Sequence, residues 1–179
     1  MPLEMIFSYG KVWSMRTFIV SIGVLAIVAF AGPARVRADA ALTGQMASSN
    51  YLVGNWNCTT KLPAMMGQPA RTEPATVTFE AAPSNVLRDH VTSTDYAGDD
   101  YFGYNDQTKT YWSASADNSG AHGGATSTDG RTYIGTSMLR SVTMNVTSTY
   151  TKVSADSITF HEVISGDGAQ VMIDSACTR

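Results

Sequence analysis

Three histidines, two cysteines and scattered carboxylates are the side chains of this chain that could do chemistry. His90, His122 and His161 stand far apart, and no H-x-x-x-H or C-x-x-C spacing occurs. A zinc site would need ligands from several distant segments to converge, so we predict no metal site and no cofactor. His161 could act as a single axial haem ligand, but an outward-facing polar side chain beside Glu162 is the simpler interpretation.

Motifs of hydrolytic and phosphate-binding enzymes are absent from the sequence. Neither G-x-S-x-G nor a phosphate-binding loop occurs. Asp95, Asp99 and Asp100 could bind calcium together with loop carbonyls, but a solvated turn explains them more simply. We therefore predict a protein that is not an enzyme. The net charge is −3 at pH 7 and no basic patch is visible, so nucleic acid is not an expected partner.

The first forty residues have the form of an export signal. Lys11 and Arg16 precede an apolar run at 17–31, and the segment 38–40 reads Ala-Asp-Ala. The run is shorter than the roughly 20 residues of a membrane-spanning helix, which argues against a membrane anchor. We interpret 1–40 as a cleaved signal peptide, starting at Met1 or Met15, and 41–179 as one secreted or periplasmic domain.

Cys58 and Cys177 are the only cysteines, and in an exported chain they predict one disulfide. The alternative is a pair of buried free thiols. If the two cysteines face each other on antiparallel neighbouring strands, paired residue numbers sum to 235 and Trp56 lies opposite Arg179. The guanidinium would then stack on the indole as a cation–π contact. This pairing would join the first strand to the last and close a barrel.

Residues 51–179 have the composition of strands and turns throughout. Thr, Ser, Val and Tyr dominate, and turn residues recur about every ten positions. Residues 41–50 are expected to be a polar lead-in that could form one helical turn. Short connections favour antiparallel neighbours. The predicted fold is all-β: a closed up-and-down antiparallel β-barrel of about ten strands, with its N- and C-terminal strands joined by the disulfide.

Two groups of residues resemble a known superfamily. Gly54-x-Trp56 on the first strand, with Arg179 on the last, resembles the calycin superfamily, which includes lipocalins and fatty-acid-binding proteins. The segments 103–111, 117–120 and 128–130 resemble a bacterial secreted lipocalin-like family of unsettled function, whose hairpin reads G-Y-D-x-x-T-x-x-Y. Asn105 stands where that family usually has Asp. The resemblance implies a small barrel with an internal cavity and transfers no catalytic residues.

A barrel of this size has room for one small ligand, held by mostly apolar walls and a few polar anchors. The candidate lining residues are large side chains between the two closing strands: Phe79, Phe102, Tyr104, Trp112, Ile134, Met138, Met144 and Phe160. The alternative is that they only fill the core. The sequence does not show which strand faces point inward.

The predicted function is binding of a small apolar or amphipathic ligand inside a secreted or periplasmic barrel, without chemistry. The first alternative is a structural or interaction module with a filled core. The second is a haem-binding barrel with His161 as the axial ligand. No oligomeric state is predicted.

Overall fold

The computed structural model describes residues 41–64, 69–166 and 168–179, so the predicted signal peptide at 1–40 lies outside the described residues. A short 3-10 helix, η1 (Gly44–Ser49), precedes ten strands. The strands are β1 (Gly54–Leu62), β2 (Arg71–Ala82), β3 (Val86–Ser93), β4 (Ala97–Asn105), β5 (Thr110–Asp117), β6 (His122–Ser127), β7 (Thr132–Leu139), β8 (Val142–Lys152), β9 (Ser157–Gly166) and β10 (Ala169–Thr178).

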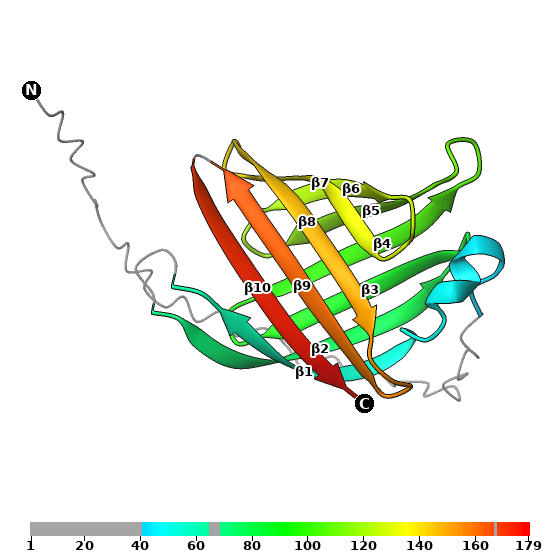
Figure 1. Cartoon of the computed structure of the whole chain (residues 1–179), viewed down its shortest axis with the longest axis horizontal. Helices are drawn as coiled ribbons and strands as arrows, with labels where there is room; N and C mark the ends of the chain where they lie inside the picture. The colour runs from blue at the N-terminus through cyan, green and yellow to red at the C-terminus, as the bar shows by residue number, and fades with distance from the viewer. Residues whose placement is uncertain (1–40, 65–68, 167) are drawn as a thin grey trace, which may run out of the picture. The chain divides into compact units, whose positions relative to one another are not determined.

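The ten strands form one closed antiparallel barrel in chain order (Figure 1). Each strand pairs with the next one along the chain, and β10 returns to pair with β1. The predicted up-and-down barrel is therefore confirmed. Across the described ranges, no helix is long and apolar enough to cross a membrane.

Tight turns between consecutive strands fix this topology. Ser84 and Asn85 join β2 to β3 with φ values of 65° and 60°, and Arg140 and Ser141 join β7 to β8 with 48° and 71°. Two successive residues with positive φ make the turn type whose twist matches an antiparallel hairpin. These turns let β3 fold directly back on β2, and β8 on β7.

The seam between β1 and β10 has the predicted register. Cys58 lies opposite Cys177, and the two form a disulfide. The Arg179 guanidinium carbon lies 4.6 Å from the centroid of the Trp56 ring. The same guanidinium donates hydrogen bonds to the carbonyls of Val53 (3.1 Å) and Ala155 (2.8 Å). Gly54 is part of this closure, since its α-carbon faces the Arg179 side chain.

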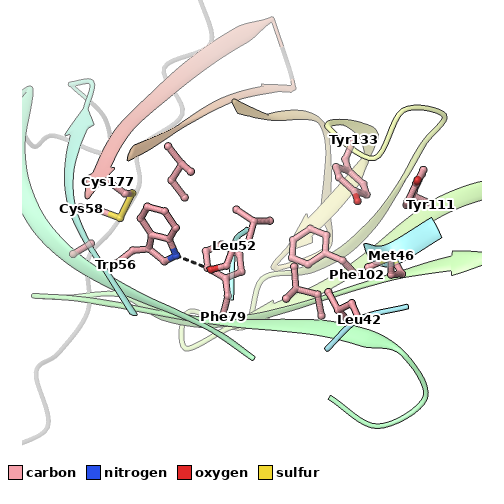
Figure 2. Close-up of a cluster of buried hydrophobic side chains, with 13 residues drawn as sticks. Leu42, Met46, Leu52, Trp56, Cys58, Phe79, Phe102, Tyr111, Tyr133 and Cys177 are labelled. Atoms are coloured by element: carbon pink, nitrogen blue, oxygen red, sulfur yellow. Dashed lines mark hydrogen bonds between the residues drawn. A yellow bond between two sulfur atoms is a disulfide. The ribbon is translucent and has the colours of Figure 1, made fainter. Parts of the chain in front are cut away.

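One end of the barrel is filled by a hydrophobic core under η1 (Figure 2). Leu42 and Met46 are 3% and 1% exposed. The Trp56 indole, also 1% exposed, donates a hydrogen bond of 2.7 Å to the Leu52 carbonyl. One cavity among these side chains has a volume of about 10 Å³, which is about enough for one water. The segment expected to be a polar lead-in therefore also buries two apolar side chains, Leu42 and Met46, at this end of the barrel.

Removing the disulfide should destabilise the barrel by about 2–4 kcal/mol, because the bond joins residues 119 positions apart and restricts the unfolded chain. We expect this loss in urea unfolding of the double variant Cys58→Ser/Cys177→Ser. Dithiothreitol should bring the wild-type protein to the variant's midpoint and leave the variant unchanged. Equal midpoints for all samples would contradict a stabilising role.

Truncating Arg179 should also weaken the seam. We expect Arg179→Ala to lower the free energy of unfolding by about 1–2 kcal/mol, from the lost cation–π contact and the two lost hydrogen bonds. Arg179→Lys should recover only part of the loss, because an ammonium does not stack as a planar guanidinium does. Lys61→Ala, on the outer face of β1, is the control and should have little effect.

Candidate functional site

The strand register shows which side chains line the barrel interior. Trp56 and Cys58 are buried on β1, so they point into the barrel. Residues that lie opposite each other on paired strands share a face, so the inward face can be followed from β1 to each neighbouring strand in turn. On β5 the inward residue is Tyr111, which is buried, and its neighbour Trp112 faces outward. Successive side chains of a strand point to opposite faces. One inward residue on a strand therefore shows which of its other residues also point inward.

Five of the candidate lining residues face inward. They are Phe79, Phe102, Tyr104, Met144 and Phe160. The Phe102 ring packs edge-to-face against Tyr133 and Tyr150, with centroid distances of 5.4 and 5.6 Å. Tyr150 in turn lies 4.9 Å from Phe160. These rings, from β4, β7, β8 and β9, form an aromatic layer across the interior, directly above the filled end.

Trp112, Ile134 and Met138 lie on the outer face, which corrects their expected inward orientation. The Trp112 ring covers Gly103, where an added Cβ would collide with it. Ile134 is 64% and Met138 42% exposed. The sequence pattern was ambiguous because apolar side chains occupy both faces of β5 and β7. Trp112 and Ile134 flank a shallow groove of about 450 Å³ that is open to solvent, with Gly124 in its lining.

His161 also points away from the interior. It is exposed, and its Nδ1 lies 2.6 Å from Asp174 Oδ1 on the neighbouring outer face of β10. From this position it cannot ligate a haem held inside the barrel, which removes the observation that motivated a haem site.

A hydrogen-bonded series on the outer wall joins Thr92, His90 and Asp99. Thr92 Oγ1 lies 3.2 Å from His90 Nε2, and His90 Nδ1 lies 3.1 Å from Asp99 Oδ1. The order of groups is that of a nucleophile, base and carboxylate. However, Arg88 donates two hydrogen bonds to the same Asp99 oxygen, and Thr92 and His90 are exposed. We interpret the series as a surface network, since its side chains do not enclose a substrate.

Three carboxyl side chains face the interior beside the aromatic layer, and the sequence analysis missed them as a group. Asp89 on β3 lies directly opposite Asp100 on β4, and Asp89 Oδ1 accepts a 3.1 Å hydrogen bond from the Asp100 amide. Glu162 enters from β9 and pairs in register with inward Ser148. Asp89 is only 2% exposed. We call Asp89, Asp100 and Glu162 the carboxyl cluster.

The barrel interior perturbs the titration of all three groups. Burial raises the pKa of Asp100 to about 6, with the charges of Asp99 and Asp117 adding to it. Burial and the charge of Asp100 raise the pKa of Glu162 to about 7. Burial, followed by the charge of Asp100, raises the pKa of Asp89 well above its ordinary value. The charge of Asp100 thus opposes the ionisation of Asp89 and Glu162, whereas a side-chain hydrogen bond with Asp89 lowers the pKa of Asp100.

Two tyrosines border the carboxyl cluster. Burial, then the charges of Asp89 and Asp100, raise the pKa of Tyr150, which belongs to the aromatic layer. Burial and the charge of Asp100 do the same to the pKa of Tyr96. The Tyr96 side chain folds back from the β3–β4 turn over Gly98, where an added Cβ would meet its hydroxyl. Tyr96 therefore covers part of the inner wall beside the cluster.

Beyond the cluster, on the side away from η1, the inward side chains are mostly small or aliphatic. We call this part the open half; its lining includes Val91, Ser93, Ser115, Gly123, Ser137, Val146, Ile164 and Ile173. All of these residues are half-buried except Ser115, which is exposed although it points inward. Solvent therefore reaches the inner wall from this end.

No cation of the protein neutralises the carboxyl cluster in the part of the chain that the structure describes. The ion pairs found there involve other carboxylates, such as Glu73 with Arg71 and Asp156 with Arg179. Nor do any three acidic, histidine or cysteine side chains among the described residues lie in a position to hold a metal ion. The cluster thus combines burial with raised pKa values, and Asp89 and Asp100 hydrogen-bond each other in place of a cation.

The raised pKa values predict that stability falls as the pH rises. Between about pH 4 and 7 the folded protein binds more protons at Asp100 and Glu162 than the unfolded chain does. We expect the melting temperature to drop by about 3–6 °C from pH 5 to pH 8. Glu162→Gln should make this dependence shallower, and Glu80→Gln, exposed on the outer wall, should not. The same slope in all three proteins would refute the assignment.

Comparison with known proteins adds no family to this description: no family model matches the chain, and neither does any curated protein. The ten-stranded antiparallel barrel is compatible with a calycin-like fold. The likeness therefore rests on strand number, topology and the closing contact between Trp56 and Arg179.

Proposed function

We propose that this barrel binds one small amphipathic ligand in its open half, without chemistry. The observation that carries the proposal is the carboxyl cluster, placed between an aromatic layer and an interior open to solvent. A ligand pocket typically combines apolar walls with a few polar groups that fix orientation. Here Phe102, Tyr150 and Phe160 supply the apolar floor, and the carboxyl cluster supplies the polar anchors.

The two halves of the interior differ in a way that favours this location. Under η1, large side chains fill the barrel almost completely. In the open half, serine, glycine and valine occupy many inward positions, and the wall is accessible to solvent. Burying three carboxyl groups with raised pKa values costs free energy, and strongly perturbed pKa values are a common feature of functional sites.

The proposal also includes export of the protein from the cytoplasm. The disulfide is compatible with an oxidising compartment, which supports a secreted or periplasmic location for the binding protein.

A second candidate is an interaction module that acts through its outer wall. The groove beside Trp112 and Ile134 favours it, because a large apolar side chain that is 64% exposed is a common feature of contact surfaces. In this case the interior would serve only as a core.

Fluorescence of N-phenyl-1-naphthylamine, an uncharged probe of apolar sites, distinguishes the two candidates. We expect saturable enhancement with one site per chain. Ser115→Trp fills the open half from its inner wall and should weaken binding at least tenfold, while Ala114→Trp, the next residue on the outer face, should not. Loss of binding in Ala114→Trp alone would place the probe on the outer wall, and no saturable signal would contradict the proposal.

A further inference from the structure

We propose that two copies of this chain associate through one side of the outer wall, the side formed by β5 to β8. The partner is a second copy of the same chain, and the surface lies on the opposite face of the wall from the proposed ligand site. Charge, hydrogen-bonding groups, shape and size of this outer side all favour a contact between copies.

The outward positions of β5 to β8 form a continuous surface without charged side chains. These four strands pair in order along the barrel wall, and all of their residues are described (Figure 1). Alternation and register assign to the outer face the even positions of 110–116, 122–126 and 132–138 and the odd positions of 143–151. None of these residues is Asp, Glu, Lys or Arg, and half are threonine. We call this surface the threonine face.

Charged outward side chains lie elsewhere on the wall. Lys61, Glu80, Arg88, Asp99 and Asp174 occupy outer positions of β1, β2, β3, β4 and β10. A surface that only faces water ordinarily carries about a quarter to a third charged residues with both signs interspersed. The centres of protein interfaces, by contrast, are depleted of Lys, Glu and Asp. The lack of charge across four adjacent strands therefore favours a contact surface.

The hydroxyl groups of the threonine face make it compatible with a copy of itself. A threonine hydroxyl both donates and accepts hydrogen bonds, whereas an ammonium group only donates and a carboxylate only accepts. Two identical threonine-rich surfaces can therefore satisfy each other's polar groups. Two uncharged faces also meet without local charge repulsion, although the net charge of the chain is −3 at pH 7.

The threonine face carries a ridge and a hollow side by side. Ile134 and Met138, which are 64% and 42% exposed, project from β7. Beside them, Gly124 on β6 has no side chain and lines the groove of about 450 Å³ together with Trp112. In a two-fold symmetric contact each pair of features meets twice. Ile134 of each copy would then enter the groove of the other, against an aromatic side chain of the kind enriched at interfaces.

The size of the face fits a reversible dimer. Four strands about 4.8 Å apart, each of about eight residues that rise 3.3 Å, give a face of roughly 500 Å². Two copies would bury about 1,000 Å² in total, which is near the lower limit of a specific interface. We therefore expect a reversible dimer with a Kd on the order of 10–100 µM.

Sedimentation velocity tests the proposal. The full chain is expressed for export, and the purified protein is measured at concentrations from well below to well above the expected Kd. We expect the sedimentation coefficient to rise with concentration along a monomer–dimer equilibrium. Thr136→Lys, on the threonine face, should raise the Kd about tenfold or more, because the contact would bury the introduced charge. Thr76→Lys, the same change at an exposed outward threonine of β2, is the matched control and should leave the Kd unchanged.

Tryptophan fluorescence identifies the surface that the dimer uses. Trp56 is 1% exposed, so acrylamide quenching of the barrel reports mainly on Trp112. We expect quenching to decrease as the wild-type dimer forms and to stay constant with concentration in Thr136→Lys.

Three results would overturn the assignment. One is a protein that remains monomeric over the whole concentration range. The second is a dimer that forms without a change in Trp112 quenching, and the third is a dimer that persists equally in Thr136→Lys, since either would use another surface. The proposed ligand site is tested separately, because a monomer that binds N-phenyl-1-naphthylamine would leave that proposal standing.

Discussion

Pairing of β1 with β10 is the interaction on which the rest of this structure depends. Nine of the ten strand pairs join neighbours along the chain, and each needs only a short turn. The tenth joins the two ends of the described fold and converts an open sheet into a barrel. Two side-chain interactions stabilise this pairing: the Cys58–Cys177 disulfide and the stacking of the Arg179 guanidinium on the Trp56 ring. Without it, two sheet edges would be exposed to solvent and to other chains.

The sequence predicted the parts of the fold that depend on local pattern and on pairs of rare residues. Ten strands follow from recurrent turn residues, and the register follows from Cys58, Cys177, Trp56 and Arg179 because so few alternatives exist. Alternation alone did not assign faces on β5 and β7, because Trp112 and Ile134 are as apolar as the inward residues Tyr111 and Tyr133. The Trp112 ring packs closely on Gly103, and this contact compensates for the exposure of an apolar ring on the outer face. A single sequence does not reveal such a contact.

The carboxyl cluster was missed for a related reason. Asp89 and Asp100 resemble ordinary surface residues in the sequence, and Asp99 beside Asp100 strengthens that impression. One signal was present: Asp89 occupies the same face as Leu87 and Val91, so the apolar alternation of β3 requires it to point inward. The electrostatic effect of Asp100 on Glu162 has no sequence signature, since it links side chains of β4 and β9 that both face the barrel interior.

The packed half of the interior under η1 thus stabilises the folded barrel, whereas the carboxyl cluster lowers its stability. Hydrophobic packing under η1 and the seam must offset the cost of burying three carboxyl groups that no cation of the described residues neutralises. Proteins commonly accept such local cost at places of function.

The seam also has a consequence for the order of events during folding. Every other strand can pair as soon as its hairpin partner is made, but β1 must wait for β10, the last strand of the fold. Until then, the growing sheet has unpaired edges at β1 and at its newest strand. Non-local pairing of this kind slows folding and leaves the intermediate prone to aggregation. The interval before closure is therefore the time at which this protein most needs protection from other chains.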